Sequence, residues 1–325
     1  MDNKSLYILE FEPILKEKIW GGSKLWTYLN KPISGDNIGE SWEISDVPGD
    51  VSIVSTGFLK GKSLSEIISI YGELILGKRN LKRFGQKFPL LIKFIDAKEN
   101  LSVQLHPGDE IAMKKHDSLG KTEMWHIIQA DKDADIIIGF NKKVTEKEYQ
   151  NLVDQKDIAT VLNREKVKPG DTFFVYAGLI HAIGAGVLLA EIQQTSDITY
   201  RIYDWDRKDA DGNYRELHQQ EALEAIDYDS SKRYKVNYVD TKDQIESLVT
   251  CPHFITNSIN VTTSQKLSHK SIDSFVIYIC VEGSIAIQGK NIPIEMKTGK
   301  TILVPAAIEE VQIVSGNGRI LQVYI

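Results

Sequence analysis

The chain has 325 residues, of which 42% are hydrophobic and 26% charged, so it is long enough for about two globular domains. Its net charge of −6 argues against a nucleic-acid-binding surface, and no stretch approaches the ~20 apolar residues of a membrane helix. Cys251 and Cys280 are too few for a disulfide framework, and the opening MDNKSLYILEFEP has no apolar run of signal-peptide length, so we expect a cytoplasmic protein.

Segments rich in β-branched and aromatic residues, separated by Gly, Pro, Asn or Asp, dominate the chain and predict strands. The earlier ones are Leu90–Ile95, Leu101–His106, Ile136–Phe140, Thr172–Ala177, Val187–Gln193 and Thr199–Trp205. The later ones are Thr250–Val261, Ser274–Val281, Ser284–Gln288, Thr301–Val304 and Arg319–Ile325. This spacing favours a mainly β barrel or sandwich over a parallel α/β sheet.

Three segments carry helix signals, over about residues 63–77, 145–162 and 216–227. Ser63 and Glu66 form a capping box at the start of the first, and Thr145 and Glu148 form one at the start of the second. The third follows the DADGN sequence, which is typical of a turn.

The polar block 229–241 predicts a linker, which divides the chain into a catalytic unit of residues 1–235 and a C-terminal unit of residues 236–325. The second unit repeats the rhythm of the first, with a glycine before a strand and a proline after it. It has no histidine at the position that His181 takes in the first unit. We therefore expect a second barrel without a metal and with a structural role.

Gln104 and His106 stand two residues apart in LSVQLHPGDE. If this segment is a strand, both side chains point to one face, while Leu101, Val103 and Leu105 take the opposite face. The pair can then converge on one point inside a barrel. A lone histidine on a strand is more often a hydrogen-bonded core residue, and glutamine is an uncommon metal ligand.

Glu123 and His181 complete a candidate metal set. Glu123 stands in GKTEMWHII, whose apolar residues predict burial, and a buried carboxylate needs a partner. His181 ends the run KPGDTFFVYAGLIH. Two imidazoles, one carboxylate and one amide oxygen are a plausible ligand set for zinc or a similar divalent metal. The alternative for Glu123 alone is a surface salt bridge.

Several sequence words together resemble the type I phosphomannose isomerases, in particular the short bacterial form: PILKEKIWGG, FPLLIKFIDA, QLHPGDE, GKTEMW and GLIHAIGAGVLLAEIQQTSDITYR. The resemblance runs from Pro13 to Arg201 and continues more weakly to the C-terminus. It implies two cupin-like (jelly-roll) barrels and one Zn²⁺ per chain, held by Gln104, His106, Glu123 and His181. It also implies interconversion of mannose 6-phosphate and fructose 6-phosphate.

Three cations are expected to bind substrate oxygens. Lys93 interrupts an apolar strand, where a lysine is costly to bury without a counter-ion, and its alternative is to extend past the sheet edge. The resemblance adds Lys121, two residues before Glu123, and Arg201 in DITYR. A guanidinium suits a phosphate or a developing enediolate because it stays charged and offers several donors.

Glu191 and Asp197 are the remaining carboxylates that the resemblance places in the site. The implied reaction transfers a proton between C1 and C2 through a cis-enediol and needs a positioned base. Glu191 is the first candidate, with Asp197 and Lys121 behind it, while Arg201 stabilises negative charge.

Other functions stay open at this point. The chain could be a cupin that binds a sugar phosphate without turnover, as a sensor. It could be another metal cupin enzyme, such as a dioxygenase, although a dioxygenase site is typically richer in histidine. A purely structural cupin would have no reason to keep the metal ligands. The expected partner is a small hexose 6-phosphate, neither a nucleic acid nor a membrane, and the oligomeric state is undetermined.

Overall fold

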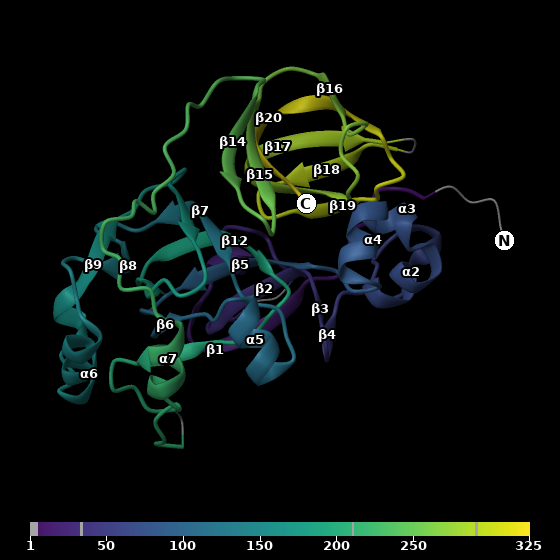
Figure 1. The fold of residues 1–325 in the computed structure, drawn as a ribbon. Coiled ribbons are helices and arrows are strands. Elements are labelled where there is room, and N and C mark those ends of the chain that lie inside the picture. The colour runs from purple at the N-terminus through teal and green to yellow at the C-terminus, as the bar shows by residue number, and fades with distance from the viewer. Residues whose placement is uncertain (1–5, 33–34, 210, 290–291) are drawn as a thin grey trace.

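The computed structural model describes residues 6–32, 35–209, 211–289 and 292–325. Two β-rich bodies make up the molecule. Figure 1 shows the C-terminal body above the N-terminal one, with a helical segment of α2 (Leu64–Tyr71), α3 (Glu73–Leu76) and α4 (Lys78–Phe84) beside them. The named strands pair antiparallel, which confirms the predicted mainly β fold.

The N-terminal body contains two main sheets. The six-stranded sheet has the order β1 (Ile14–Gly22), β2 (Ile38–Ile44), β5 (Leu90–Ala97), β12 (Val187–Gln194), β7 (Glu123–Ala130) and β10 (Thr172–Val175). The five-stranded sheet has the order β13 (Tyr200–Tyr203), β6 (Val103–Leu105), β11 (His181–Ile183), β8 (Asp135–Phe140) and β9 (Leu162–Lys166). A short hairpin joins β3 (Asp46–Val47) to β4 (Asp50–Val51). Strands β5 and β12 are buried along their whole length, so both faces of the first sheet are covered.

The C-terminal body is one seven-stranded sheet. Five strands follow the order β14 (Ile245–Thr250), β15 (Ile255–Val261), β20 (Glu310–Tyr324), β17 (Val276–Gln288) and β18 (Ile294–Lys297). The other two strands pair at the side: β16 (Gln265–Ser268) pairs with β20, and β19 (Thr301–Val304) pairs with β17. The two strands predicted over 274–288 are one strand, β17. Gly283 (φ 73°) bends it beside a bulge instead of making a turn. The strand predicted over 250–261 is instead divided between β14 and β15, and the last predicted strand is the end of the longer β20.

The predicted helices are present with altered bounds. The Ser63 hydroxyl accepts a hydrogen bond from the Glu66 amide at 3.2 Å, and the Glu66 carboxylate accepts one from the Ser63 amide at 2.7 Å. The predicted segment, about residues 63–77, breaks into α2 and α3 at Gly72 (φ 43°). Gly77 (φ 88°) separates α3 from α4, which lies beyond the predicted range. The other two predicted segments are α6 (Glu146–Asp154) with a 3-10 turn at Ile158–Val161, and α7 (Gln219–Ala225).

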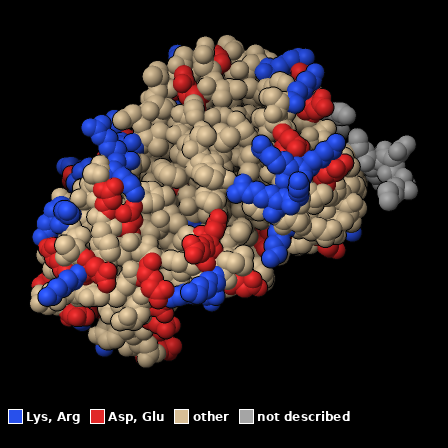
Figure 2. Space-filling view, in the orientation of Figure 1, with Lys and Arg blue, Asp and Glu red and all other residues tan. Residues whose placement is uncertain are grey.

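Several elements carried no signal that we recognised: β1, β2, β7, α1 (Lys24–Thr27), a 3-10 turn at Gly57–Leu59 and α5 (Asp109–His116). Helix α5 buries only Ala112, so it has no apolar stripe to reveal it. In the described parts of the chain, no helix has the length and apolar character needed to cross a membrane. Figure 2 shows acidic and basic side chains spread over one face, with basic ones gathered over the helical segment that includes α4, whose sequence is KRNLKRF.

The two bodies share one hydrophobic core. The same apolar cluster contains residues of the N-terminal segment, of α2 and α3, of the outer face of the six-stranded sheet and of the C-terminal body. The rings of Phe88 and Phe275 are fully buried with centroids 4.5 Å apart, and Leu9 and Leu303 exchange two backbone hydrogen bonds. The scaffold of the site therefore depends on this junction.

Phe275→Ala tests the shared core. Truncating a buried phenylalanine removes apolar burial and leaves a cavity, so we expect the free energy of unfolding to fall by about 3–5 kcal/mol. Urea denaturation measures this loss, and Val239→Ala, at a residue that is 71% exposed, is the control, with a change within about 0.5 kcal/mol. A loss below about 1 kcal/mol for Phe275→Ala would show that the junction is not part of the core.

Candidate active site

Four side chains lie side by side on the inner face of the six-stranded sheet. Strand register sets Trp42 opposite Lys93, Lys93 opposite Glu191, and Glu191 opposite Trp125, across β2, β5, β12 and β7. Directly opposed residues of antiparallel strands point to the same face, so register alone makes these side chains neighbours. The row places an ammonium and a carboxylate between two indole rings.

A second row crosses the five-stranded sheet. Arg201 of β13 lies opposite Gln104 of β6, and Gln104 lies opposite His181 of β11. The two apolar residues that flank Gln104 in β6 belong to a separate cluster on the other face, as the alternation predicted. Leu101 departs from that prediction, because it precedes the strand and lines the same cavity as Gln104.

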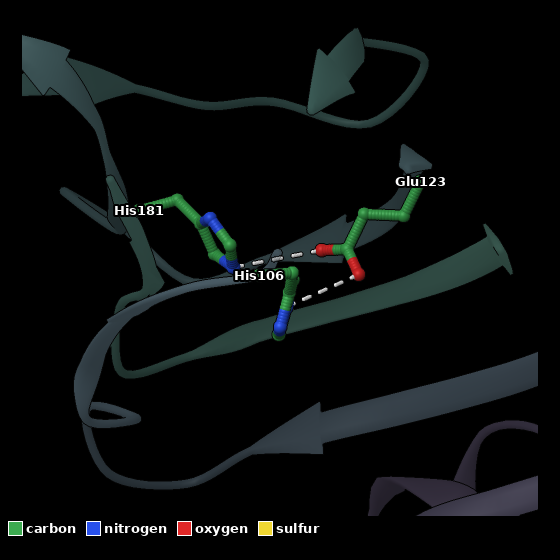
Figure 3. A group of neighbouring side chains, drawn as sticks. All are labelled: His106, Glu123 and His181. Carbon is green, nitrogen blue, oxygen red and sulfur yellow. Dashed lines mark ion pairs between the residues drawn. The ribbon is translucent and has the colours of Figure 1, made fainter. Parts of the chain in front are cut away.

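His106, Glu123 and His181 converge between the two sheets (Figure 3). Their ligand atoms all lie within 4.8 Å of one another, and all three side chains are buried. The Nε2 atoms of His106 and His181 lie 3.5 and 3.7 Å from the two Glu123 carboxylate oxygens. These distances are too long for good hydrogen bonds, and both Nε2 atoms and Glu123 Oε2 have no partner among the described residues.

Backbone carbonyls fix the orientation of both imidazoles. His106 Nδ1 lies 2.9 Å from the Ile198 carbonyl oxygen, and His181 Nδ1 lies 2.8 Å from that of Leu179. A carbonyl only accepts, so each Nδ1 carries the proton and each Nε2 presents a lone pair to the cluster. Metal-binding histidines are oriented in this way.

The electrostatics of the cluster favour a bound cation. Burial lowers the pKa of His106 well below its usual value and lowers that of His181 to about 3, so both imidazoles are neutral. Burial, and then the nearby Glu191 carboxylate, raise the pKa of Glu123 to about 8 in the absence of a cation. Two neutral imidazoles and a buried carboxylate with unused lone pairs are a donor set that suits a divalent metal such as zinc.

Gln104 lies directly opposite His181 across paired strands, next to this cluster. Its Oε1 accepts a hydrogen bond of 3.3 Å from the Ser102 hydroxyl, and its side chain is partly exposed on the cavity wall. The strand pairing with His181 keeps the amide next to the histidines.

A cavity of about 290 Å³ opens beside the cluster, close to the lower limit of about 300 Å³ for small-molecule sites. It is lined by charged groups of both signs: Lys18, Glu40, Lys93, Lys121, Glu191, Asp197, Arg201 and Arg215, together with Trp20, Ser102, Gln104, Trp125 and Thr199. The structure thus brings every residue of the predicted site to the cavity or to the metal cluster at its side.

Lys93 lies inside the cavity and not at a sheet edge, with only 3% of its surface exposed. Its Nζ is 3.5 Å from Glu191 Oε1 and 4.9 Å from the centre of the Trp42 ring. Burial alone would lower the pKa of Lys93, but Glu40 and Glu191 outweigh burial and raise it, so this lysine stays charged.

Glu191 holds one carboxylate oxygen and leaves the other free. Oε2 accepts a hydrogen bond of 3.0 Å from Trp125 Nε1, whereas Oε1 is buried without a hydrogen-bond partner among the described residues. Asp197 also faces the cavity but is an exposed residue. The buried carboxylate is therefore the more strongly positioned of the two.

Lys121 and Arg201 both line the cavity beside the cluster of His106, Glu123 and His181. Lys121 is buried with its Nζ 3.7 Å from Glu123 Oε2. Arg201 donates from Nη1 to the Glu216 carbonyl at 2.8 Å, while its buried Nε has no partner in the described chain. Burial, and then the Arg215 guanidinium, lower the pKa of Arg201.

Sequence reasoning missed Lys18, Glu40 and Arg215 in the cavity wall. Glu40 accepts a hydrogen bond from Trp42 Nε1 at 2.7 Å and lies 3.3 Å from Lys18. Burial would raise the pKa of Glu40, but Lys93 and Lys18 outweigh it and lower the value. The segments KEKIWGG and IGESWEI do not alternate polar and apolar residues, so periodicity gave no signal for β1 and β2.

The C-terminal body places its histidines differently. His269 is buried, with Nε2 2.8 Å from the Tyr278 hydroxyl and Nδ1 3.2 Å from the Ile308 carbonyl oxygen, so both ring nitrogens are engaged in core hydrogen bonds. His253 lies at the surface of the junction, 3.9 Å from Asp109.

Two family models match the chain. Residues 8–124 match the model described as phosphomannose isomerase type I, catalytic domain, and residues 244–325 match mannose-6-phosphate isomerase, cupin domain. The second match confirms the predicted cupin-type fold.

Relatives match almost the whole chain. It is 38% identical to the mannose-6-phosphate isomerase ManA of Bacillus subtilis over 93% of this chain and 94% of that protein. It is 32% identical to a mannose-6-phosphate isomerase of Streptococcus mutans over 92% of both. The crystal structure of a mannose 6-phosphate isomerase from Bacillus subtilis superposes with a TM-score of 0.89 at 32% identity, covering 98% of this chain and 100% of that one.

Proposed function

The chain belongs to the type I phosphomannose isomerase family, and we propose that it interconverts mannose 6-phosphate and fructose 6-phosphate with one zinc ion. The observation that carries this proposal is the convergence of His106, Glu123 and His181 beside the Lys93–Glu191 pair. Both histidine Nε2 atoms and Glu123 Oε2 are buried and find no donor in the described part of the chain. We propose that His106 and His181 bind the ion through Nε2, Glu123 through its carboxylate, and Gln104 through its amide oxygen.

The reaction moves a proton between C2 and C1 of the open-chain sugar through a cis-enediol, so it needs a base and stabilisation of the sugar oxygens. We assign Glu191 as the base, because its Oε1 is buried without a hydrogen bond from any described residue, and because Glu191 lines the cavity next to Lys93. Asp197 and Lys121 are the next candidates. When bound, the metal supplies positive charge that favours negative charge on O1 and O2.

Three cations are assigned to the substrate oxygens: Lys93, Lys121 and Arg201. All three line the cavity, and the buried Arg201 Nε has no hydrogen-bond partner among the described residues. They give an acidic protein the local positive charge that a sugar phosphate requires. A phosphorylated substrate also supports the cytoplasmic location expected for this chain.

The division into a catalytic unit of residues 1–235 and a C-terminal unit of residues 236–325 is likewise a proposal. Few regular elements lie between β13 and β14, which supports a boundary in this stretch. The shared core means that the two units support each other's folding.

Conversion of mannose 6-phosphate by the purified protein tests the function. We expect fructose 6-phosphate to accumulate until the two sugars reach equilibrium, followed by NMR. Saturable binding without product would contradict the proposal and favour the sensor. Oxygen consumption with an iron-containing preparation would favour a dioxygenase.

Arg201→Ala tests the charge-stabilising role. Loss of a guanidinium that acts on the transition state is expected to lower kcat at least about tenfold, or 1.4 kcal/mol of barrier. Arg164→Ala, which removes an arginine of β9 that pairs with Asp135, is the control and should leave kcat unchanged. A decrease of less than about tenfold for Arg201→Ala would rule out the assigned role.

A further inference from the structure

The segment between β13 and α7 returns Arg215 to the active-site cavity. Asp204, only 5% exposed, fixes this arginine: one carboxylate oxygen accepts a hydrogen bond of 2.7 Å from Arg215 Nε, and the other accepts one from Arg215 Nη2. The same carboxylate accepts a bond of 2.6 Å from Arg207 Nη2. A bidentate pair of this kind holds a guanidinium in one orientation.

Charge is unevenly distributed around the cavity. Each of its lysines has a carboxylate within 4 Å, in the pairs Lys18–Glu40, Lys93–Glu191 and Lys121–Glu123. By contrast, Arg215 and Arg207 share the carboxylate of Asp204, with Glu99 a further 3.8 Å partner of Arg207 alone. Arg201 has no ion pair among the described residues, only the bond to a backbone carbonyl. The positive charge in excess therefore lies at the corner formed by Arg201 and Arg215.

This corner also keeps free donors. Arg215 Nη1 and the buried Nε of Arg201 donate to no atom of the described chain, and both side chains line the cavity. Arg201 lies next to Gln104 in the sheet, so the corner is beside the metal cluster but separate from it. Free, preorganised guanidinium donors are suited to a phosphate dianion.

We propose that Arg215 binds the phosphate group of the substrate, and that Asp204 is the positioning residue that holds Arg215 for it. The inference rests on the proposed function and adds the direction of the substrate: its phosphate faces Arg215, and C1 and C2 lie toward Glu191 and the metal ligands. Arg215 thereby becomes the residue that selects phosphorylated over free sugars.

Arg215→Gln is the primary test, because this side chain is at the cavity edge and its loss spares the core. The phosphate is bound equally in the ground state and in the transition state, so losing its charged hydrogen bond weakens both to the same extent. We therefore expect KM for mannose 6-phosphate to rise at least about tenfold, while kcat stays within about threefold. Arg215→Lys recovers part of the loss. The matched control is Arg207→Gln. Arg207 contacts the same carboxylate and, like Arg215, lines a neighbouring cavity of about 470 Å³, but it does not line the active-site cavity, so its KM stays within about threefold.

Inorganic phosphate serves as a second probe. Its dissociation constant, measured by calorimetry on the zinc-loaded protein, rises by the same factor in Arg215→Gln and not in Arg207→Gln. Asp204→Asn raises KM in the same direction, and the double variant with Arg215→Gln is no worse than Arg215→Gln alone, as expected for a residue that acts through Arg215.

The outcomes separate this inference from the proposed function. Phosphate binding that depends on Arg215 in a protein without turnover would support the inference and refute the isomerase. Turnover with an unchanged KM and unchanged phosphate affinity in Arg215→Gln would overturn the inference and leave the isomerase standing.

Discussion

Glu123→Gln is expected to remove the metal and to lower kcat by more than about 100-fold. Loss of a group that only orients a ligand already costs about 10–100-fold in metal affinity or activity, and Glu123 is proposed to be a ligand itself. Among the described residues, it is also the one carboxylate that groups with His106 and His181. Glutamine keeps the size of the side chain and removes its charge, so the change reports on charge and coordination. Metal content after dialysis and kcat measure the two effects together.

Glu43→Gln is the matched control for this change. Glu43 is a buried glutamate too, but its partner is Lys31, at 2.6 Å, in the wall of a different cavity. The control is expected to lose stability and to keep both its metal and its kcat. A Glu123→Gln protein with full metal content and normal turnover would remove Glu123 from the ligand set.

Glu191→Gln is expected to lower kcat by about 10²–10⁴-fold, the usual contribution of a positioned general base. The amide oxygen can still accept the hydrogen bond from Trp125, and the volume is unchanged, so KM should change little. Loss of the carboxylate also removes the partner of Lys93, which makes a small decrease in stability the expected side effect.

Two parallel variants identify the base among the candidates. Asp197→Asn and Lys121→Met should each reduce kcat less than Glu191→Gln does, because Asp197 is exposed and Lys121 is engaged with Glu123. The ranking is read from kcat across a pH series for all three proteins. If Asp197→Asn gave the largest loss, the base would have to be reassigned to Asp197.

Local patterns predicted part of the site, and the family resemblance supplied Lys121, Glu191, Asp197 and Arg201. The two-residue interval between Gln104 and His106 fixed their common face, and the apolar surroundings of Lys93 and Glu123 indicated burial, which the structure shows. The spacing of residues in the sequence cannot predict contacts between distant strands, whereas strand register explains them. Lys93 and Glu191 are 98 positions apart in the chain yet lie directly opposite each other in the sheet.

The remaining parts depend on long-range contacts that leave no local signal. Glu40 and Lys18 enter the cavity only because β1 and β2 join the edge of the six-stranded sheet. Arg215 enters the cavity because its guanidinium is hydrogen-bonded to the buried Asp204. The DADGN sequence before it predicts only a turn. Gly283 predicted a turn by its residue type, whereas pairing with β20 on both sides kept the strand continuous.

The most direct test of the central claim is to measure zinc content and mannose 6-phosphate turnover on the same samples before chelation, after chelation and after zinc is restored. The account predicts about one zinc per chain, loss of turnover in proportion to the metal removed, and recovery when zinc is returned. Turnover that persists in fully metal-free protein would contradict the metal's role. Zinc-loaded protein without turnover of mannose 6-phosphate would contradict the function itself.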